Sequence, residues 1–286
     1  MSERDEISLR ELFLLLAREK WLVAVLALLG AVSGFVIAWL LPVEFDATTI
    51  ISPVTSNSTA GRLAGQASQL GGLAALVGIN IGGDANRSES LAVLQSMALT
   101  ERYIRDNNLL PVLFPEAWDP VKKDWRSREP GRMPTLWKGN KKFLKIRTVT
   151  EDKKTTLVSL TITWTDPVTA ANWANGLVAL TNDVLRAKAI HESEQHIAYL
   201  NAEAARTDVA QVRAAIYAVL ESEIKNVMLA RGPGDYALKV LDPALAPEVK
   251  TGPKKALWAL AGLFLGVLFS FCVLYVRSAW RAGARQ

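Results

Sequence analysis

The chain has 286 residues, half of them apolar, and a mean hydropathy of +0.16. This is apolar for a soluble protein and polar for one that crosses a membrane many times, so we expect few membrane spans and one sizeable soluble part. The net charge of +5 is mild and no nucleic-acid motif accompanies it, which argues against nucleic acid as a partner. The only cysteine, Cys272, lies in an apolar run, so the soluble part has no thiol for a disulfide or zinc.

Residues 21–43 form the first long run without a charge. Trp21 and Trp39 lie near its ends, where amphipathic aromatic side chains favour the headgroup layer of a bilayer. The alternative is a cleaved signal peptide, but its apolar core is usually about 7–15 residues long and no A-x-A site follows here. We therefore expect a transmembrane helix over residues 21–43, after a cytoplasmic tail of residues 1–20.

Residues 44–54 (EFDATTIISPV) are rich in β-branched side chains and predict a strand. The sequence GGLAALVGINIGG at residues 71–83 is too glycine-rich for one stable helix and unusually apolar for a loop in water. It is interpreted either as a mobile surface loop or as a segment that touches the membrane or a partner. The candidate contact residues are its large apolar side chains, Leu73, Leu76, Val77, Ile79 and Ile81.

Residues 88–107 show helical spacing, with Ser88 as a plausible N-cap. The residues expected to share its apolar face are Leu91, Leu94, Met97, Ala98 and Ile104. Residues 111–140 are irregular and place Trp118, Trp125 and Trp137 among basic residues. Such rings beside cations suit stacking on sugars or bases, although tryptophans that simply pack this excursion onto the domain are the plainer interpretation.

Residues 145–150 and 156–165 alternate apolar and polar side chains and predict two strands joined by a polar turn. Asp166 and Pro167 then suit an N-cap and a first helical residue. Strong helix formers continue to Arg231.

A single helix over residues 167–231 would be about 100 Å long. The chain must return, because a strand expected at residues 236–241 is followed closely by a second apolar run. The turn is expected at Arg206–Asp208, where Asp208 with Gln211 resembles a capping box. The sequence therefore predicts a helical hairpin over residues 189–231 on a strand-and-helix base formed by residues 44–188 and 235–255.

Residues 256–276 carry no charge and make a helix of about 30 Å, enough to cross a bilayer core. Lys and Arg are about twice as dense in the tails, residues 1–20 and 277–286, as in residues 44–255. Both tails are therefore expected in the cytoplasm and the domain of residues 44–255 outside it. The predicted fold class is an α+β membrane protein, in which two transmembrane helices flank an exported α/β base domain with a long helical hairpin.

Both apolar runs contain G-x-x-x-G. Gly30 and Gly34 lie in the first, and Gly262 and Gly266 lie in the second, where Ser270 extends the spacing. Small residues four apart share a helix face and allow close helix packing, although the pattern is also common by chance. We expect the ridge in the second span to pack against the first span near its two glycines.

No residue pattern predicts catalysis. His191 and His196 would lie about 140° apart around a helix, so they cannot share a metal. The sequence has no phosphate-binding loop, no G-x-S-x-G and no H-E-x-x-H. We expect no catalytic, metal-binding or cofactor-binding residues, no cofactor, and a protein that is not an enzyme.

A proline-rich entry to the second span carries a family resemblance. Pro243 and Pro247 precede Pro253 and Lys254, and an eleven-residue run then leads to Gly266. The segment TITWTDPVTAANWANGLV resembles the same family's junction between sheet and helix. Together with the two spans, these features resemble the bacterial polysaccharide co-polymerases, or Wzz-type chain-length determinants, in the form without a C-terminal tyrosine kinase domain.

The resemblance implies a non-enzymatic regulator of surface polysaccharide length, whether of O-antigen in lipopolysaccharide, capsule or exopolysaccharide. It implies a ring-like homo-oligomer in the bacterial inner membrane with a periplasmic main domain. The expected partners are the membrane, the glycan polymerase and the lipid-linked glycan, with no nucleic acid. The alternative is a membrane adaptor of polysaccharide export or an activator of a separate tyrosine kinase, because the basic tail Arg277–Gln286 suits an acidic partner.

Overall fold

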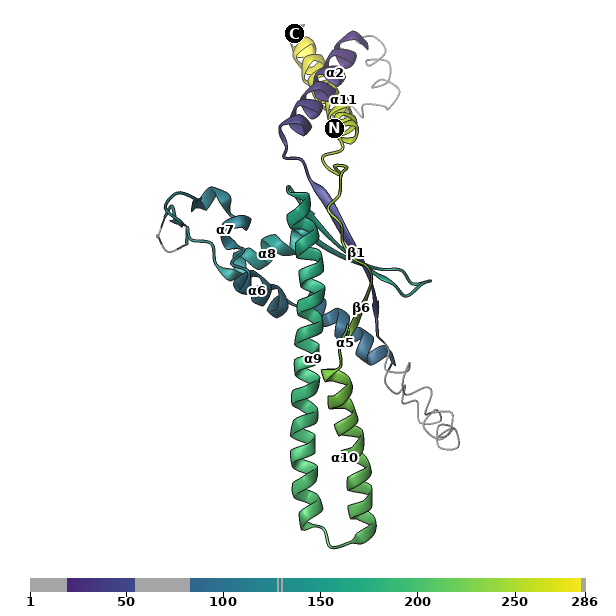
Figure 1. Ribbon diagram of the computed structural model, residues 1–286. Helices are drawn as coiled ribbons and strands as arrows, with labels where there is room; N and C mark the ends of the chain where they lie inside the picture. Colours follow the sequence, from purple (N-terminus) through teal and green to yellow (C-terminus); the bar gives the residue numbers. More distant parts are fainter. Residues whose placement is uncertain (1–19, 55–82, 128, 130, 284–286) are drawn as a thin grey trace. The chain divides into compact units, whose positions relative to one another are not determined.

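The computed structural model describes residues 20–54, 83–127, 129 and 131–283 (Figure 1). The chain divides into two compact units. One contains the two ends of the chain, residues 1–45 and 249–286, and the other contains residues 46–248.

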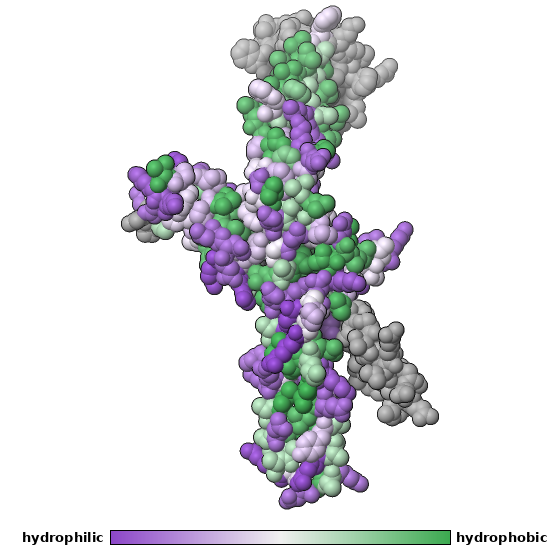
Figure 2. Space-filling model, in the orientation of Figure 1, coloured by the Kyte–Doolittle hydropathy of each residue, from purple (hydrophilic) through white to green (hydrophobic). Residues whose placement is uncertain are grey.

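The first unit contains two long apolar helices that lie side by side (Figure 1). They are α2 (Lys20–Leu40) and α11 (Lys255–Gly283). Their apolar parts, Trp21–Leu40 and Lys255–Leu274, are long and apolar enough to cross a membrane. Helix α2 stops short of residue 43 because Pro42 disfavours helical conformation in the residue before it. Figure 2 shows hydrophobic residues over the visible face of this pair.

The second unit is built on a four-stranded sheet in the order β4-β5-β1-β6. Its strands are β1 (Phe45–Pro53), β4 (Arg147–Glu151), β5 (Val158–Trp164) and β6 (Leu238–Asp242). Strand β4 pairs antiparallel with β5, and β1 pairs antiparallel with β6 across a register irregularity between Ile50 and Ile51. The strand predicted from residue 145 begins two residues later, because the preceding helix continues to Ile146.

The two faces of the sheet differ in chemistry because side chains alternate along each strand. On one face Val158, Leu160 and Ile162 are fully buried in the core that α9 and the neighbouring helices cover. On the other face hydroxyl groups bond across strands. Thr48 and Thr161 lie 2.8 Å apart through their Oγ1 atoms, and Thr163 donates to Asp46 over 2.6 Å.

A 40-residue helix, α9 (Pro167–Arg206), begins as predicted, because Asp166 accepts a hydrogen bond from the backbone N–H of Thr169 over 2.8 Å. It pairs with α10 (Ala210–Arg231) in a hairpin (Figure 1). The capping box predicted at Asp208 is wrong, since the N-cap of α10 is Val209, which makes no side-chain cap. The predicted α+β fold class, with apolar terminal helices and long helices between, is confirmed.

The helix predicted over residues 88–107 is two helices, α5 (Gly83–Gln95) and α6 (Met97–Asp106). Ser96 ends the first and caps the second, because its hydroxyl accepts a hydrogen bond from the N–H of Leu99 over 3.1 Å. The interruption changes the buried face, so that Leu99 and Tyr103 enter the core while Met97 is exposed. The predicted N-cap, Ser88, lies inside α5.

Residues 110–146 form a lobe of short elements beside α6 (Figure 1). They are α7 (Leu110–Leu113), the 3-10 turn η1 (Pro115–Ala117), β2 (Trp118–Asp119), β3 (Asp124–Trp125) and α8 (Leu136–Ile146). Trp118 and Trp125 pack edge to face with ring centroids 5.0 Å apart, so these two tryptophans hold the excursion together.

Candidate functional site

The four glycines of the two G-x-x-x-G patterns lie at one contact between α2 and α11. A Cβ atom added to Gly30 would lie 2.3 Å from the carbonyl oxygen of Gly262, and one added to Gly266 would lie 2.5 Å from that of Leu26. A Cβ on Gly34 would likewise lie 2.3 Å from the Trp258 carbonyl oxygen. No side chain fits these distances, so backbone meets backbone along the contact.

Ser270 continues this buried line of small residues on α11. Its hydroxyl donates to the carbonyl oxygen of Val267 over 2.6 Å, and the residue is fully buried. A serine hydroxyl satisfied within its own helix can lie in an apolar contact without a costly unpaired donor.

The proline-rich residues lie on the connection that follows β6. Pro243 is exposed and Pro247 is half-buried, both within the second unit. Pro253 and Lys254 belong to the first unit, where the Lys254 carbonyl oxygen accepts a hydrogen bond from the N–H of Leu257 over 3.0 Å and so begins α11. Three backbone hydrogen bonds join Glu44 to Thr251 and Gly252, so the chain enters and leaves the first unit at one place.

Two asparagines on α9 hold β6 and the connection after it, and no pattern in the sequence singles them out. Asn182 is buried, and its Oδ1 accepts hydrogen bonds from the N–H groups of Ala237 over 2.9 Å and Leu238 over 2.8 Å. Asn175, two turns earlier, exchanges two hydrogen bonds of 2.9 Å with the backbone of Ala244. Asparagine suits this position because one amide supplies both a donor and an acceptor.

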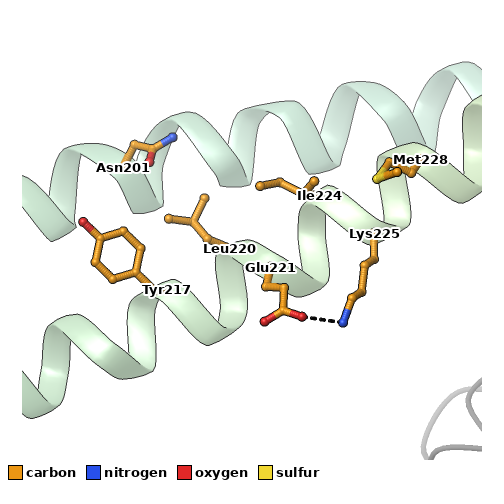
Figure 3. Close-up of a pocket in the computed structure, with 7 residues that line it drawn as sticks. All are labelled: Asn201, Tyr217, Leu220, Glu221, Ile224, Lys225 and Met228. Atoms are coloured by element: carbon orange, nitrogen blue, oxygen red, sulfur yellow. Dashed lines mark hydrogen bonds and ion pairs between the residues drawn. The ribbon is translucent and has the colours of Figure 1, made fainter.

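A shallow groove of about 470 Å³ runs along the hairpin (Figure 3). It is lined by Asn201 of α9 and by Tyr217, Leu220, Glu221, Ile224, Lys225 and Met228 of α10. Glu221 and Lys225 form an ion pair of 2.6 Å at its edge, and three large side chains, Tyr217, Ile224 and Met228, remain about half exposed or more. The groove has an apolar floor and large exposed apolar side chains, so it suits contact with a partner.

Within the described residues, no cluster of His, Cys, Asp or Glu is arranged to hold a metal ion. His191 bonds to Gln195, while His196 faces Glu223 of the other hairpin helix over 3.2 Å. The candidate contact residues Leu73, Leu76, Val77, Ile79 and Ile81 lie outside the described residues, as does most of the apolar loop to which they belong.

The N-terminal part of the chain is similar to a known protein family. Residues 5–107, which include the first apolar helix and β1, match the model of the Wzz family, described as chain length determinant protein. The match covers less than half of the chain, so it is a similarity to the Wzz family over the N-terminal part. The matched part of the chain ends at the C-cap of α6, before the lobe and the hairpin.

Solved structures similar to this chain include a "full-length bacterial polysaccharide co-polymerase", at 13% identity and a TM-score of 0.37, with 96% of this chain and 99% of that chain covered. A fragment of WzzB, a polysaccharide co-polymerase from Salmonella Typhimurium, is 9% identical with a TM-score of 0.30, over 73% of this chain and 100% of that chain. The search of curated proteins gave no significant match.

Proposed function

We propose that this chain regulates the length of a surface polysaccharide and is not itself an enzyme. The observation that carries the proposal is the match of residues 5–107 to a family of chain length determinant proteins. The two apolar helices are consistent with it.

In this proposal the chain lies in the bacterial inner membrane with both tails in the cytoplasm and the second unit in the periplasm. The greater density of Lys and Arg in the tails supports that orientation. The chain acts as a ring-like homo-oligomer beside the glycan polymerase and its lipid-linked glycan. The apolar groove of the hairpin supports self-association, because a monomer would leave Tyr217, Ile224 and Met228 in water.

The proposal is tested by deleting the gene in its native host and separating the surface glycan on a gel. A changed length distribution, restored by the wild-type gene, is expected. An unchanged distribution with a normal amount of polymer would contradict the proposal.

The second candidate function is a membrane adaptor for polysaccharide export or an activator of a separate tyrosine kinase, motivated by the basic residues of the tail Arg277–Gln286. Removal of residues 278–286 separates the two candidates. A length regulator keeps its glycan distribution after this truncation, whereas an adaptor loses export or kinase phosphorylation.

A further inference from the structure

Helix α8 carries an unusual concentration of positive charge. Its eleven residues, LWKGNKKFLKI, include four lysines and no acidic residue. The surrounding segment, residues 109–146, holds nine Lys or Arg against four Asp or Glu, and this net charge of +5 equals that of the whole chain. Outside this segment, basic and acidic residues balance in total.

The lysines of α8 lie on one face because their spacing is i, i+3, i+4 and i+7. They are Lys138, Lys141, Lys142 and Lys145. The opposite face, which includes the fully buried Phe143, packs into the core. This buried face fixes α8 on the domain and directs its basic face toward water.

Two of these lysines hold the lobe together. Lys138 donates to the carbonyl oxygen of Gly131 over 2.6 Å, and Lys142 bonds to the carbonyl oxygen of Leu113. The other two, Lys141 and Lys145, are exposed and form no ion pair with any carboxylate in the part of the chain that the structure describes. Their charges are free to meet an anionic partner.

An exposed aromatic ring lies next to these lysines. Trp137 is 57% exposed, and the Nζ atom of Lys141 lies 5.4 Å from the centroid of its ring. About two turns further on, Leu144 is 47% exposed. A flat apolar ring beside unpaired cations fits a ligand that has both an apolar face and negative charge.

We propose that Trp137, Lys141 and Lys145 form a surface that binds an acidic polysaccharide. The C–H face of a pyranose ring stacks on the indole, while carboxylate or phosphate groups of the same chain pair with the two ammonium groups. The inference rests on the proposed function, because it identifies the polymer whose length is regulated as anionic.

The same surface fits an anionic membrane less well. A helix that lies in a lipid headgroup layer presents its large apolar face to the lipid. Here the large apolar face of α8 is buried in the domain, and only Trp137 and Leu144 remain exposed beside the lysines. A repeating acidic glycan needs no deep apolar insertion, so charge and a single stacking ring are sufficient.

The test uses the full-length protein in neutral detergent and titrates it with oligogalacturonate, an acidic glycan, and with dextran, a neutral one. The variant K141Q/K145Q removes both free charges, and Trp137→Ala removes the ring. The matched control is K153Q/K154Q, which removes two exposed lysines from the turn between β4 and β5. Vesicles of phosphatidylglycerol form a separate arm.

We expect the wild type to bind oligogalacturonate but not dextran, with affinity that falls as salt rises. K141Q/K145Q should bind about tenfold more weakly and Trp137→Ala several-fold more weakly, while the control binds like the wild type. Equal binding by K141Q/K145Q and wild type would overturn the inference. So would lysine-dependent binding to the vesicles with none to the glycan.

The inference and the proposed function fail separately. If gene deletion leaves the glycan length unchanged while these lysines still govern oligogalacturonate binding, only the proposed function is wrong. If deletion changes the length but K141Q/K145Q retains full binding, only the acidic-glycan surface is wrong.

Discussion

Two pairs of antiparallel helices in this molecule are held together in opposite ways. In the α2–α11 pair, Gly30 lies against Gly262 and Gly34 against Trp258, so that the backbones themselves are in contact. In the α9–α10 hairpin, buried side chains such as Leu220 and Val227 fill the seam. Ion pairs flank that seam, including Arg231 with Glu194 over 2.7 Å.

The difference follows from the surroundings that each pair suits. Between helices in lipid there is no hydrophobic driving force, so association depends on close packing, which small residues allow. In water the burial of an apolar seam drives association, and charges at its rim add little. The two pairs should therefore respond differently to mutation, because the first depends on the absence of side chains and the second on their presence.

The largest effect is expected from Gly266→Leu. Its Cβ atom would lie 2.5 Å from the Leu26 carbonyl oxygen, so the helices must separate, at a cost of about 3 kcal/mol or more. Leucine favours the membrane, so insertion should persist while the thermal midpoint of the purified protein falls and glycan length control is lost. Ala261→Leu, on the exposed side of α11, is the matched control. A normal oligomer with normal glycan length in Gly266→Leu would show that the close contact is dispensable.

A smaller effect is expected where α9 holds the strand that follows the hairpin. Asn182→Ala leaves two backbone N–H groups and the Leu238 carbonyl oxygen without their buried partner, which should cost about 2–3 kcal/mol. Hydrogen exchange of β6 should accelerate, whereas exchange in α2 and α11 should not change. The exposed Asn201→Ala serves as the control. Unchanged exchange in β6 would mean that water replaces the amide without loss.

The seam of the hairpin provides the next test. Leu220 is 5% exposed, so Leu220→Ala should cost about 2 kcal/mol, the low end for a buried leucine, because a two-helix seam can partly collapse. Val219→Ala, at a neighbouring residue that is 49% exposed, should cost far less. The two variants are compared by hydrogen exchange along α10. Equal protection in both would contradict the view that the buried apolar seam stabilises the hairpin.

The smallest effect is expected from pH. Burial raises the pKa of Glu223, but hydrogen bonds from Ser193, His196 and Asn226 outweigh burial and leave that pKa lowered. A lowered carboxyl pKa gives stability that is present above the ordinary value of 4.5 and is lost as the pH falls through the folded-state value. The thermal midpoint of the wild type should therefore decline below pH 4.5 more steeply than that of Glu223→Gln. If the thermal midpoints of the two proteins fall in parallel, the Glu223 carboxylate does not contribute to the stability of the hairpin.

Local signals in the sequence were sufficient for much of the fold. Asp166 followed by Pro167 predicts a helix start that the structure contains, because an N-cap depends on its own few residues. The alternation along Val158–Trp164 likewise identifies the buried face of a strand. Ser96 shows the limit of such signals, since the apolar spacing around it fits a continuous helix, whereas its hydroxyl caps a new helix in the structure.

The candidate site was harder to predict from the sequence, because its polar residues bond to partners far along the chain. Asn182 looks like any polar helix residue until β6, more than fifty residues later, lies against it. The α8 lysines had a readable signal in their i, i+3, i+4, i+7 spacing, but the sequence did not show that Lys141 and Lys145 lack carboxylate partners. Whether a carboxylate lies near these two lysines depends on how distant parts of the chain fold together.

The pairing of β1 with β6 places a constraint on biosynthesis. Ile51 lies opposite Val240, so one edge of β1 stays unpaired until β6 is synthesised about 190 residues later. At the usual rate of about 5–20 residues per second, that delay is roughly ten to forty seconds. During this interval the exposed edge of β1 presents unpaired backbone groups to any other nascent chain. The sheet therefore closes only after β6 has been made, and a ribosome that stalls before β6 leaves a product prone to aggregation.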